Sequence, residues 1–231
     1  EIMPSLVGSE MCIRDRNDAE YLFYKDYPRL RLDVTMPEIH RDDIVMIGSY
    51  YAVTPQLRDK VKELLDKARE KGAIIYYDVN FRSTHKNEAI KLLPVILENF
   101  EYADIIRGSV EDFENMFGLT DADKVYKSKI EFYCPHFICT HGGKGIRLYT
   151  KNIKKHYEAD PLQTVSTVGA GDNFNAGVVF GLLKYRIRRD DLDELSEDDW
   201  DHVIRCGKDF SADVCMSLNN SISKEFAAGY K

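Results

Sequence analysis

Short apolar runs alternate with longer segments of helical periodicity along this chain, and that alternation restricts the fold more than any other feature. Each apolar run ends at or near a small or polar residue, as is typical of strands buried on both faces. The runs are 44–47, 73–77, 103–106 and 137–139, and the helical segments are 55–71, 87–100, 171–185 and 197–216. The pattern predicts an α/β fold with a mostly parallel sheet and helices on both faces. Residues 146–149 are expected to pair as a following edge strand.

Composition narrows the class of protein further. The 231 residues carry a net charge of −7 and are 44% hydrophobic. These values are typical of a globular protein and argue against a protein that coats nucleic acid. No apolar stretch approaches the roughly 18 residues of a membrane helix. The Cys residues are odd in number and form no CxxC pair, so we expect reduced thiols and a cytoplasmic location. The His residues show no zinc-ligand spacing.

Residues 1–16 differ from the rest of the chain. They lack the basic and apolar regions of a signal peptide, and 11–16 resembles a translated sequencing-adapter end. We therefore expect 1–16 to be a non-native leader, with a genuine disordered leader as the alternative. No repeat or Pro-rich break divides 17–231, which we expect to form one domain and the C-terminal part of a longer protein.

The segment 166–177 carries the strongest chemical signal. Gly169, Ala170 and Gly171 are small enough for backbone N–H groups to approach an anion closely. The helix that begins there adds the positive end of its dipole. Asp172 lies in the first helical turn and can accept a proton from an attacking hydroxyl group. The alternative is a purely structural helix start, with Gly for packing and Asp for capping.

Polar side chains follow the strand predicted at 73–77, at the edge where open parallel sheets bind ligands. Strand alternation puts Asp78, Asn80 and Arg82 on one side of the chain if it stays extended. The guanidinium of Arg82 offers a fixed fork of donors that suits a phosphate group. The alternative is a polar turn that caps the sheet.

Two further polar segments follow the next strands. After 103–106, Glu111 or Asp112 can hold water around Mg²⁺, and the alternative is that Ser109 and the acidic residues cap a short helix. After 137–139, the segment 140–145 is expected to form a tight hairpin turn. This turn is not a Walker A loop, because the upstream Gly spacing is wrong and its Lys is followed by Gly. Its Gly residues can still let a nucleotide come close.

Taken together, these segments resemble the ribokinase/PfkB carbohydrate kinase family, in particular its fructokinase-like members. The motifs that carry the resemblance are Asp-x-Asn-x-Arg at 78–82, Ser-x-Glu-Asp at 109–112, Thr-x-Gly-x-x-Gly at 140–145 and Thr-x-Gly-Ala-Gly-Asp at 167–172. The resemblance covers essentially all of 17–231. It implies a ribokinase-like three-layer sandwich that transfers the γ-phosphoryl group of ATP to a hydroxyl of a small sugar, with Mg²⁺.

The resemblance also implies a role for each matching residue. Asp172 would be the base, and the amides of Gly169, Ala170 and Gly171 would form the anion hole. Asp112, with Glu111, would hold Mg²⁺ through water. Residues on the nucleotide or phosphate side would be Asn80, Arg82, Arg107, Thr140, Gly142, Gly145, Thr167 and Asn219. Ser166 stands where the family has an Asp that often helps bind K⁺, so K⁺ is left open as a further cofactor.

Other parts of the family pattern are absent from this sequence. It contains no Gly-Gly-x-x-x-Asn sugar motif, and 21–24 is the remnant we expect of the family's β-sheet lid. We therefore expect the chain to be poorly active alone, with an exposed sheet edge that favours aggregation. A homodimer is expected only for the full-length protein, since lid strands often mediate dimers in this family. The alternatives are a non-catalytic nucleotide- or sugar-binding remnant and a nucleoside kinase of the same family.

Overall fold

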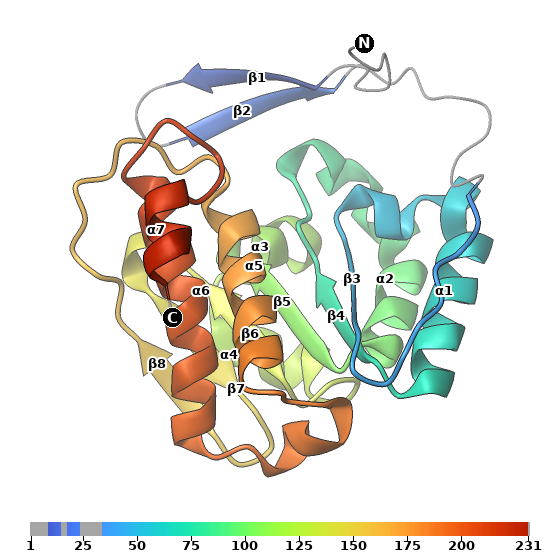
Figure 1. Ribbon diagram of the computed structural model, residues 1–231. Coiled ribbons are helices and arrows are strands. Elements are labelled where there is room, and N and C mark those ends of the chain that lie inside the picture. Colours follow the sequence, from blue (N-terminus) through green and yellow to red (C-terminus); the bar gives the residue numbers. More distant parts are fainter. Residues whose placement is uncertain (1–8, 15–17, 24–33, 231) are drawn as a thin grey trace. The chain divides into compact units, whose positions relative to one another are not determined.

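The computed structural model describes residues 9–14, 18–23 and 34–230 (Figure 1). The chain divides into two compact units. We call Val34–Asp160 with Leu182–Trp200 the sheet unit, and Pro161–Gly181 with Asp201–Lys231 and the residues up to Asp33 the loop unit. Among the described residues, no helix is long and apolar enough to cross a membrane.

The sheet unit is built on a 6-stranded sheet whose strands follow the order of the chain, β3-β4-β5-β6-β7-β8. The strands are β3 Ile44–Gly48, β4 Ile74–Asp78, β5 Ile105–Ser109, β6 Phe137–Thr140, β7 Ile146–Tyr149 and β8 Lys154–Tyr157. Strands β3 to β6 run parallel, and β7 and β8 are added antiparallel. The predicted mostly parallel sheet is therefore confirmed, and each apolar run contributes a strand.

Strand β7 is not the edge strand that the sequence predicts. Strand β8 pairs along the side of β7 that faces away from β6, with His156 opposite Arg147. The sequence of β8 is Lys-Lys-His-Tyr, and its residues are exposed or half-buried. The strand therefore lacks the apolar alternation by which a buried strand is recognised.

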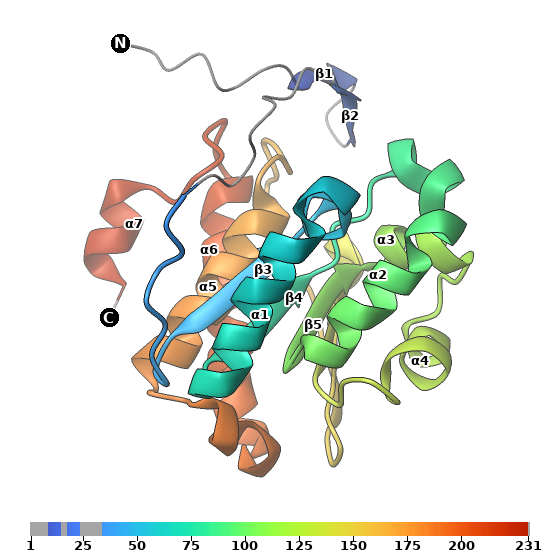
Figure 2. The ribbon, with the colours of Figure 1, turned by 90° about the vertical axis from the view of Figure 1, so that its right-hand side faces the viewer.

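The helices of the sheet unit connect successive strands. They are α1 Arg58–Lys71, α2 Ala89–Tyr102, α3 Val110–Phe117 and α4 Ala122–Val125, with the short turns η1 Tyr50–Val53, η2 Pro55–Leu57, η3 Ser83–Glu88, η4 Tyr126–Ile130, η5 Gly142–Lys144 and η6 Arg189–Glu194. Helices α1 and α2 lie side by side across the parallel strands (Figure 2). Helix α1 is followed by Gly72, whose φ of 74° is the left-handed conformation that commonly ends a helix.

Core contacts hold these helices on the sheet. Strand β4 is buried at every position, as expected for a central strand covered on both faces. Phe100 of α2 packs on Tyr77 of β4, with ring centroids 5.9 Å apart. Helix α3 approaches β5 so closely that a Cβ added at Gly108 would lie 2.7 Å from the ring of Phe113. These contacts position the carboxyl ends of the strands, where the predicted site residues of this unit lie.

The loop unit contains a hairpin and the helices that carry the Gly-rich segment. Strands β1 Ser9–Arg14 and β2 Asp18–Phe23 pair antiparallel. Strand β1 lies within the expected leader, and β2 includes 21–23 of the predicted lid remnant, whereas residue 24 lies outside the described residues. Helices α5 Ala170–Lys184 and α6 Glu197–Cys215 match the predicted segments closely, and α7 Lys224–Gly229 follows.

Glycine residues bring α5 and α6 into close contact within the loop unit. A Cβ at Gly177 would lie 2.3 Å from the carbonyl oxygen of Cys206, and one at Gly207 would lie 2.7 Å from the ring of Phe174. Real side chains do not tolerate such distances, so only Gly fits here. The first turns of α5, where the predicted base lies, are thereby fixed against α6.

Candidate functional site

The carboxyl edge of the sheet unit joins the ends of three neighbouring strands through Arg107 of β5. Its Nη1 donates to Oδ1 of Asp78 on β4 at 2.9 Å, and its Nη2 donates to Oγ1 of Thr140 on β6 at 2.9 Å. Both members of the ion pair are buried. Burial is the largest single effect on Arg107 and would lower its pKa, but Asp78, Tyr76 and Asp112 together outweigh burial and raise the pKa. The guanidinium is therefore a permanent buried cation that ties these strand ends together.

Asp112 forms a capping box with Ser109 at the start of α3. Its Oδ2 accepts hydrogen bonds from the Ser109 backbone N–H at 2.6 Å and from the Ser109 hydroxyl at 2.7 Å. Asp112 is buried, and burial raises the pKa of its carboxyl group against the lowering effects of Ser109 and Arg107. The capping role that the sequence left open is thus observed.

The same end of α3 bears on the predicted Mg²⁺ site. Glu111, next to Asp112, is exposed. Among the described residues no cluster of three His, Cys, Asp or Glu side chains could hold a metal ion. Mg²⁺ commonly takes one or two carboxylates and completes its shell with water and substrate phosphates. Asp112 and Glu111 therefore do not form a site made by protein ligands alone, and a water-rich Mg²⁺ held by these two carboxylates stays a prediction.

The segment after β4 departs from the extended course that the sequence analysis assumed. Asn80 has a φ of 38°, so the chain bends there and does not stay extended, and extension was the condition under which alternation would align Asp78, Asn80 and Arg82. Asn80 and Arg82 are half-buried. Ser49, after β3, also has a positive φ of 53°, and its N–H donates to the carbonyl oxygen of Asp78 at 3.2 Å. Strained residues of this kind cluster at functional sites.

The predicted hairpin between β6 and β7 is confirmed at 140–145. Gly142 has a φ of 48° and Gly145 a φ of 94°. A Cβ at Gly145 would lie 2.1 Å from the carbonyl oxygen of Tyr157 on β8. The backbone therefore requires Gly145 for packing, while Gly142 lies at an exposed turn.

The Gly-rich segment of the loop unit is anchored by Asn173. Its Nδ2 donates to the carbonyl oxygens of Gly169 and Asn220, both at 2.9 Å. Gly169 has a φ of 78°, and a Cβ there would lie 2.9 Å from the Asn220 carbonyl oxygen. The loop that contains Asn219 is thus held next to the Gly169 turn.

The start of α5 leaves Asp172 exposed in its first turn. The N–H of Ala170 donates to the carbonyl oxygen of Thr167 at 3.2 Å, and helical bonding begins with the N–H of Asn173, which donates to the carbonyl oxygen of Gly169 at 2.9 Å. The earliest N–H groups of a helix have no acceptor within it. This end of α5 therefore offers backbone donors and a carboxylate at one place.

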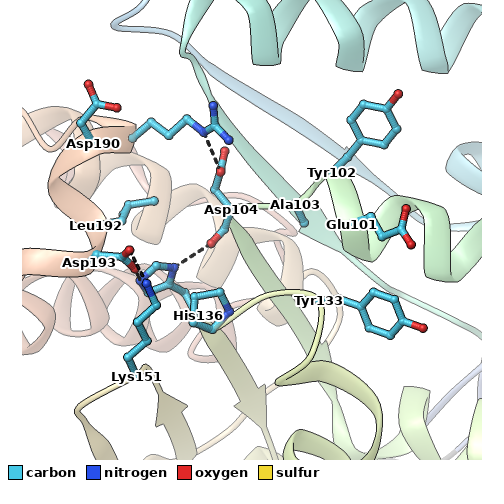
Figure 3. Close-up of a pocket in the computed structure, with 12 residues that line it drawn as sticks. Glu101, Tyr102, Ala103, Asp104, Tyr133, His136, Lys151, Asp190, Leu192 and Asp193 are labelled. Carbon is cyan, nitrogen blue, oxygen red and sulfur yellow. Dashed lines mark hydrogen bonds and ion pairs between the residues drawn. The ribbon is translucent and has the colours of Figure 1, made fainter.

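A cavity of about 520 Å³ lies at the opposite, amino edge of the sheet, before β5 and β6 (Figure 3). Several of its charged groups are paired with one another. Arg189 contacts Asp104 at 2.7 Å, Lys151 contacts Asp193 at 2.5 Å, and Nε2 of His136 lies 3.3 Å from Asp193. None of the site residues predicted from the sequence lines it. These contacts join η6 to the amino ends of the strands.

Comparison with known proteins identifies the family. Residues 11–223 match the family described as pfkB family carbohydrate kinase. The chain belongs to this family. The resemblance inferred from the ordered motifs is therefore confirmed.

Relatives of this pfkB family chain include named sugar kinases. The chain is 28% identical over 201 residues to a probable fructokinase-4 of Arabidopsis thaliana, covering 80% of this chain and 58% of that one. It is 27% identical over 186 residues to a 5-dehydro-2-deoxygluconokinase of Geobacillus thermodenitrificans, covering 74% and 53%. The chain thus spans little more than half the length of the curated relatives it matches.

Solved structures confirm the ribokinase-like α/β fold. Fructokinase from Vibrio cholerae O395, in a form with fructose, ADP and calcium ion bound, superposes with a TM-score of 0.77 at 16% identity, covering 96% of this chain and 73% of that one. Aminoimidazole riboside kinase from Salmonella enterica gives a TM-score of 0.70 at 20% identity, covering 84% and 64%. At these identities the likeness shows the fold alone.

Within the pfkB family chain, each unit gathers its own predicted residues. The carboxyl edge of the sheet unit gathers those that follow β4, β5 and β6, and the loop unit gathers those around the start of α5. Sequence reasoning assigned no role to Ser49 or Asn173. Asn173 directly follows Asp172 and is the type of residue that bonds backbone carbonyls, which is a usable signal. The strain at Ser49 has no such signal in the sequence.

Proposed function

We propose that the protein is an ATP-dependent kinase that phosphorylates a hydroxyl group of a small sugar, with fructose-like sugars as the first class to test. The observation that carries this proposal is the start of α5, where a Gly169 turn with positive φ precedes a helix bearing Asp172 in its first turn. A module that only binds its ligand has no need of a base at an anion-binding turn. The names of the fructokinase relatives support the substrate class.

In the proposed reaction, Asp172 takes the proton of the acceptor hydroxyl. The hydroxyl oxygen forms a bond to the γ-phosphorus of ATP as the bond from that phosphorus to the β–γ bridging oxygen breaks, and ADP leaves. The amides of the Gly169–Gly171 loop would donate to the transferring phosphoryl group, and that of Ala170 would first have to leave Thr167. Such reactions depend on positioning and charge stabilisation.

The other predicted residues take supporting roles in this proposal. Mg²⁺ bound with ATP would offset phosphate charge, held through water by Asp112 and Glu111. The residues proposed on the nucleotide or phosphate side are Asn80, Arg82, Arg107, Thr140, Gly142, Gly145, Thr167 and Asn219. Ser166 leaves no carboxylate for K⁺ at its position, so the proposal includes no K⁺ dependence.

The proposal extends to the setting of the protein. It places the kinase in the cytoplasm, with a homodimer in the full-length form. Residues 1–16 are proposed to be a non-native leader, and the family match begins at residue 11, inside that segment.

The test is ATP-dependent phosphorylation of a panel of sugars and nucleosides by the longest chain that the coding DNA encodes, followed as ADP release. Asp172→Asn is expected to lower kcat by about 10²–10⁴-fold, the usual contribution of a general base, while ATP still binds. Asp198→Asn is the matched control, because Asp198 is also an exposed carboxylate in the first turn of a helix, here α6.

Each other outcome assigns a different function. ATP or sugar binding without turnover of any acceptor would favour the non-catalytic remnant and refute the kinase. Turnover confined to nucleosides would favour the nucleoside kinase, a class to which the named aminoimidazole riboside kinase draws attention. Equal activity of Asp172→Asn and Asp198→Asn would show that Asp172 is not the base.

A further inference from the structure

The two terminal nitrogens of the buried Arg107 guanidinium already have hydrogen-bond partners within the protein. Nη1 and Nη2 are engaged by Asp78 and Thr140, each at 2.9 Å, and the Arg107 side chain is only 8% exposed. Both nitrogens are thus already bonded within the protein, and little of the side chain is accessible to a phosphate oxygen. Direct contact with the nucleotide is therefore the weaker assignment for this residue.

Strand register explains why the contacts converge. Asp78 and Arg107 are directly paired across β4 and β5, and Arg107 is paired with Ile138 of β6. Thr140 lies two residues beyond Ile138, so its side chain is on the same face of the sheet. Arg107 therefore spans from one neighbouring strand to the other, and its planar fork sets both directions at once.

The hydrogen bond from Arg107 also limits which further hydrogen bonds the Thr140 hydroxyl can make. Oγ1 of Thr140 accepts from Nη2, so one acceptor position of the oxygen is occupied and the hydroxyl hydrogen points elsewhere. Thr140 is half-buried and is the last residue of β6, where the turn 140–145 begins. The hydroxyl therefore remains a donor, with its hydrogen directed away from Arg107.

We propose that Arg107 is a positioning residue for nucleotide binding, which aims the Thr140 hydroxyl as a donor at ATP and does not contact ATP itself. The Asp78 carboxylate would hold the guanidinium in the plane that this requires. This inference rests on the proposed kinase function, because it takes ATP as the ligand of the carboxyl edge.

The test is a double-mutant cycle on ATP affinity, with Arg107→Lys and Thr140→Val in the longest encoded chain. Lys keeps the charge beside Asp78, but its single nitrogen lacks the fork needed to hold Thr140 as well. Each variant is expected to raise the Kd for ATP by about tenfold, the effect of losing one hydrogen bond to a charged group. Because both remove the same donor, the double variant is also expected to be about tenfold weaker.

Kinetics and controls separate positioning from a general structural effect. In the positioning role, KM for ATP rises while kcat at saturating ATP stays nearly constant, and Thr140→Ser restores affinity because it keeps the hydroxyl. Arg147→Lys is the matched control, since Arg147 lies on β7 with a half-exposed side chain and a weak 3.9 Å contact to Asp123. Its ATP affinity is expected to equal that of the unmodified chain.

The outcomes that would overturn the inference are distinct. Independent effects, which would multiply to about 100-fold in the double variant, would show that Arg107 contacts ATP itself. Unchanged affinity in Arg107→Lys, or equal loss in Thr140→Ser and Thr140→Val, would also refute it. Failure of the unmodified chain to bind ATP would instead refute the proposed function, and this inference with it.

Discussion

Breaking the buried ion pair between Asp78 and Arg107 is predicted to destabilise the sheet unit far more than breaking a shorter pair on the surface. Their side chains are 5% and 8% exposed, with a contact of 2.9 Å. The i,i+4 pair Lys127–Glu131 has a contact of 2.6 Å but side chains 69% and 43% exposed. Removing one charge of a buried pair costs about 3–5 kcal/mol, because the other charge stays buried. An exposed helix pair contributes about 0.3–0.5 kcal/mol.

The matched variants are Asp78→Asn and Glu131→Gln, which change an acid to its amide with little change in volume. Asp78→Asn is expected to lower the free energy of unfolding by about 3 kcal/mol, or about 6–12 °C in Tm for a chain of this size. Glu131→Gln is expected to lower it by less than about 0.5 kcal/mol. Urea unfolding followed by Trp200 fluorescence is the assay, because this single Trp is fully buried in the sheet unit.

A second variant tests the reason for the effect. Arg107→Met in the Asp78→Asn background removes the cation that the first change leaves unpaired, so the double variant is expected to be more stable than the sum of the single changes predicts. Equal losses in Asp78→Asn and Glu131→Gln would refute the argument, since burial would then not control the strength of the pair. Strict additivity in the double variant would refute it as well.

Three further outcomes follow from packing and ionisation. Gly177→Ala is expected to lower stability by about 1–3 kcal/mol in thermal melts, since its Cβ would lie 2.3 Å from the Cys206 carbonyl oxygen. The control Gly143→Ala has open space around its Cβ and should change stability by less than about 0.5 kcal/mol. Asp112→Asn should unfold at higher urea concentration at pH 7, because burial raises the pKa of this carboxyl and penalises its charge, while Mg²⁺-dependent ATP affinity falls. Burial lowers the pKa of His136, so the folded state favours its neutral form. The stability that depends on this form is fully present above about pH 6.5 and is lost as the pH falls further. In urea titrations from pH 7 to 5, the free energy of unfolding should fall less in His136→Phe than in the unmodified chain.

The elements with local signals were predictable from the sequence. Gly72 ends α1 with a positive φ, and Ser109 and Ser196 each form a capping box with the Asp three residues later. In each case the signal lies within a few residues of the feature. Strand β8 and the segment 122–130 were missed because their sequences carry charge where apolar periodicity would mark an element.

Features that depend on neighbouring strands were less predictable. Asn80 has a positive φ, which non-Gly residues adopt rarely. Strand alternation therefore does not describe which way the side chains after β4 point. Arg107 can bond to both Asp78 and Thr140 only because of the register in which β4, β5 and β6 pair, and no single sequence segment encodes that register. The family resemblance placed Arg107 on the nucleotide or phosphate side, and the sequence alone does not show that Arg107 pairs with Asp78.

The sequential order of the strands explains why weak motifs became informative when read together. Because β4, β5 and β6 are neighbours in the sheet as well as successive in the chain, the segments after them must lie side by side at one edge in the same order. Each motif alone has a structural explanation, and the structure confirms several of those explanations, such as the Ser109 capping box. Their order along the chain, however, determines where each motif lies in the fold, because exchanging two motifs would move their side chains to different strand ends. The order of the motifs therefore carried information about the site that the composition of each motif lacked.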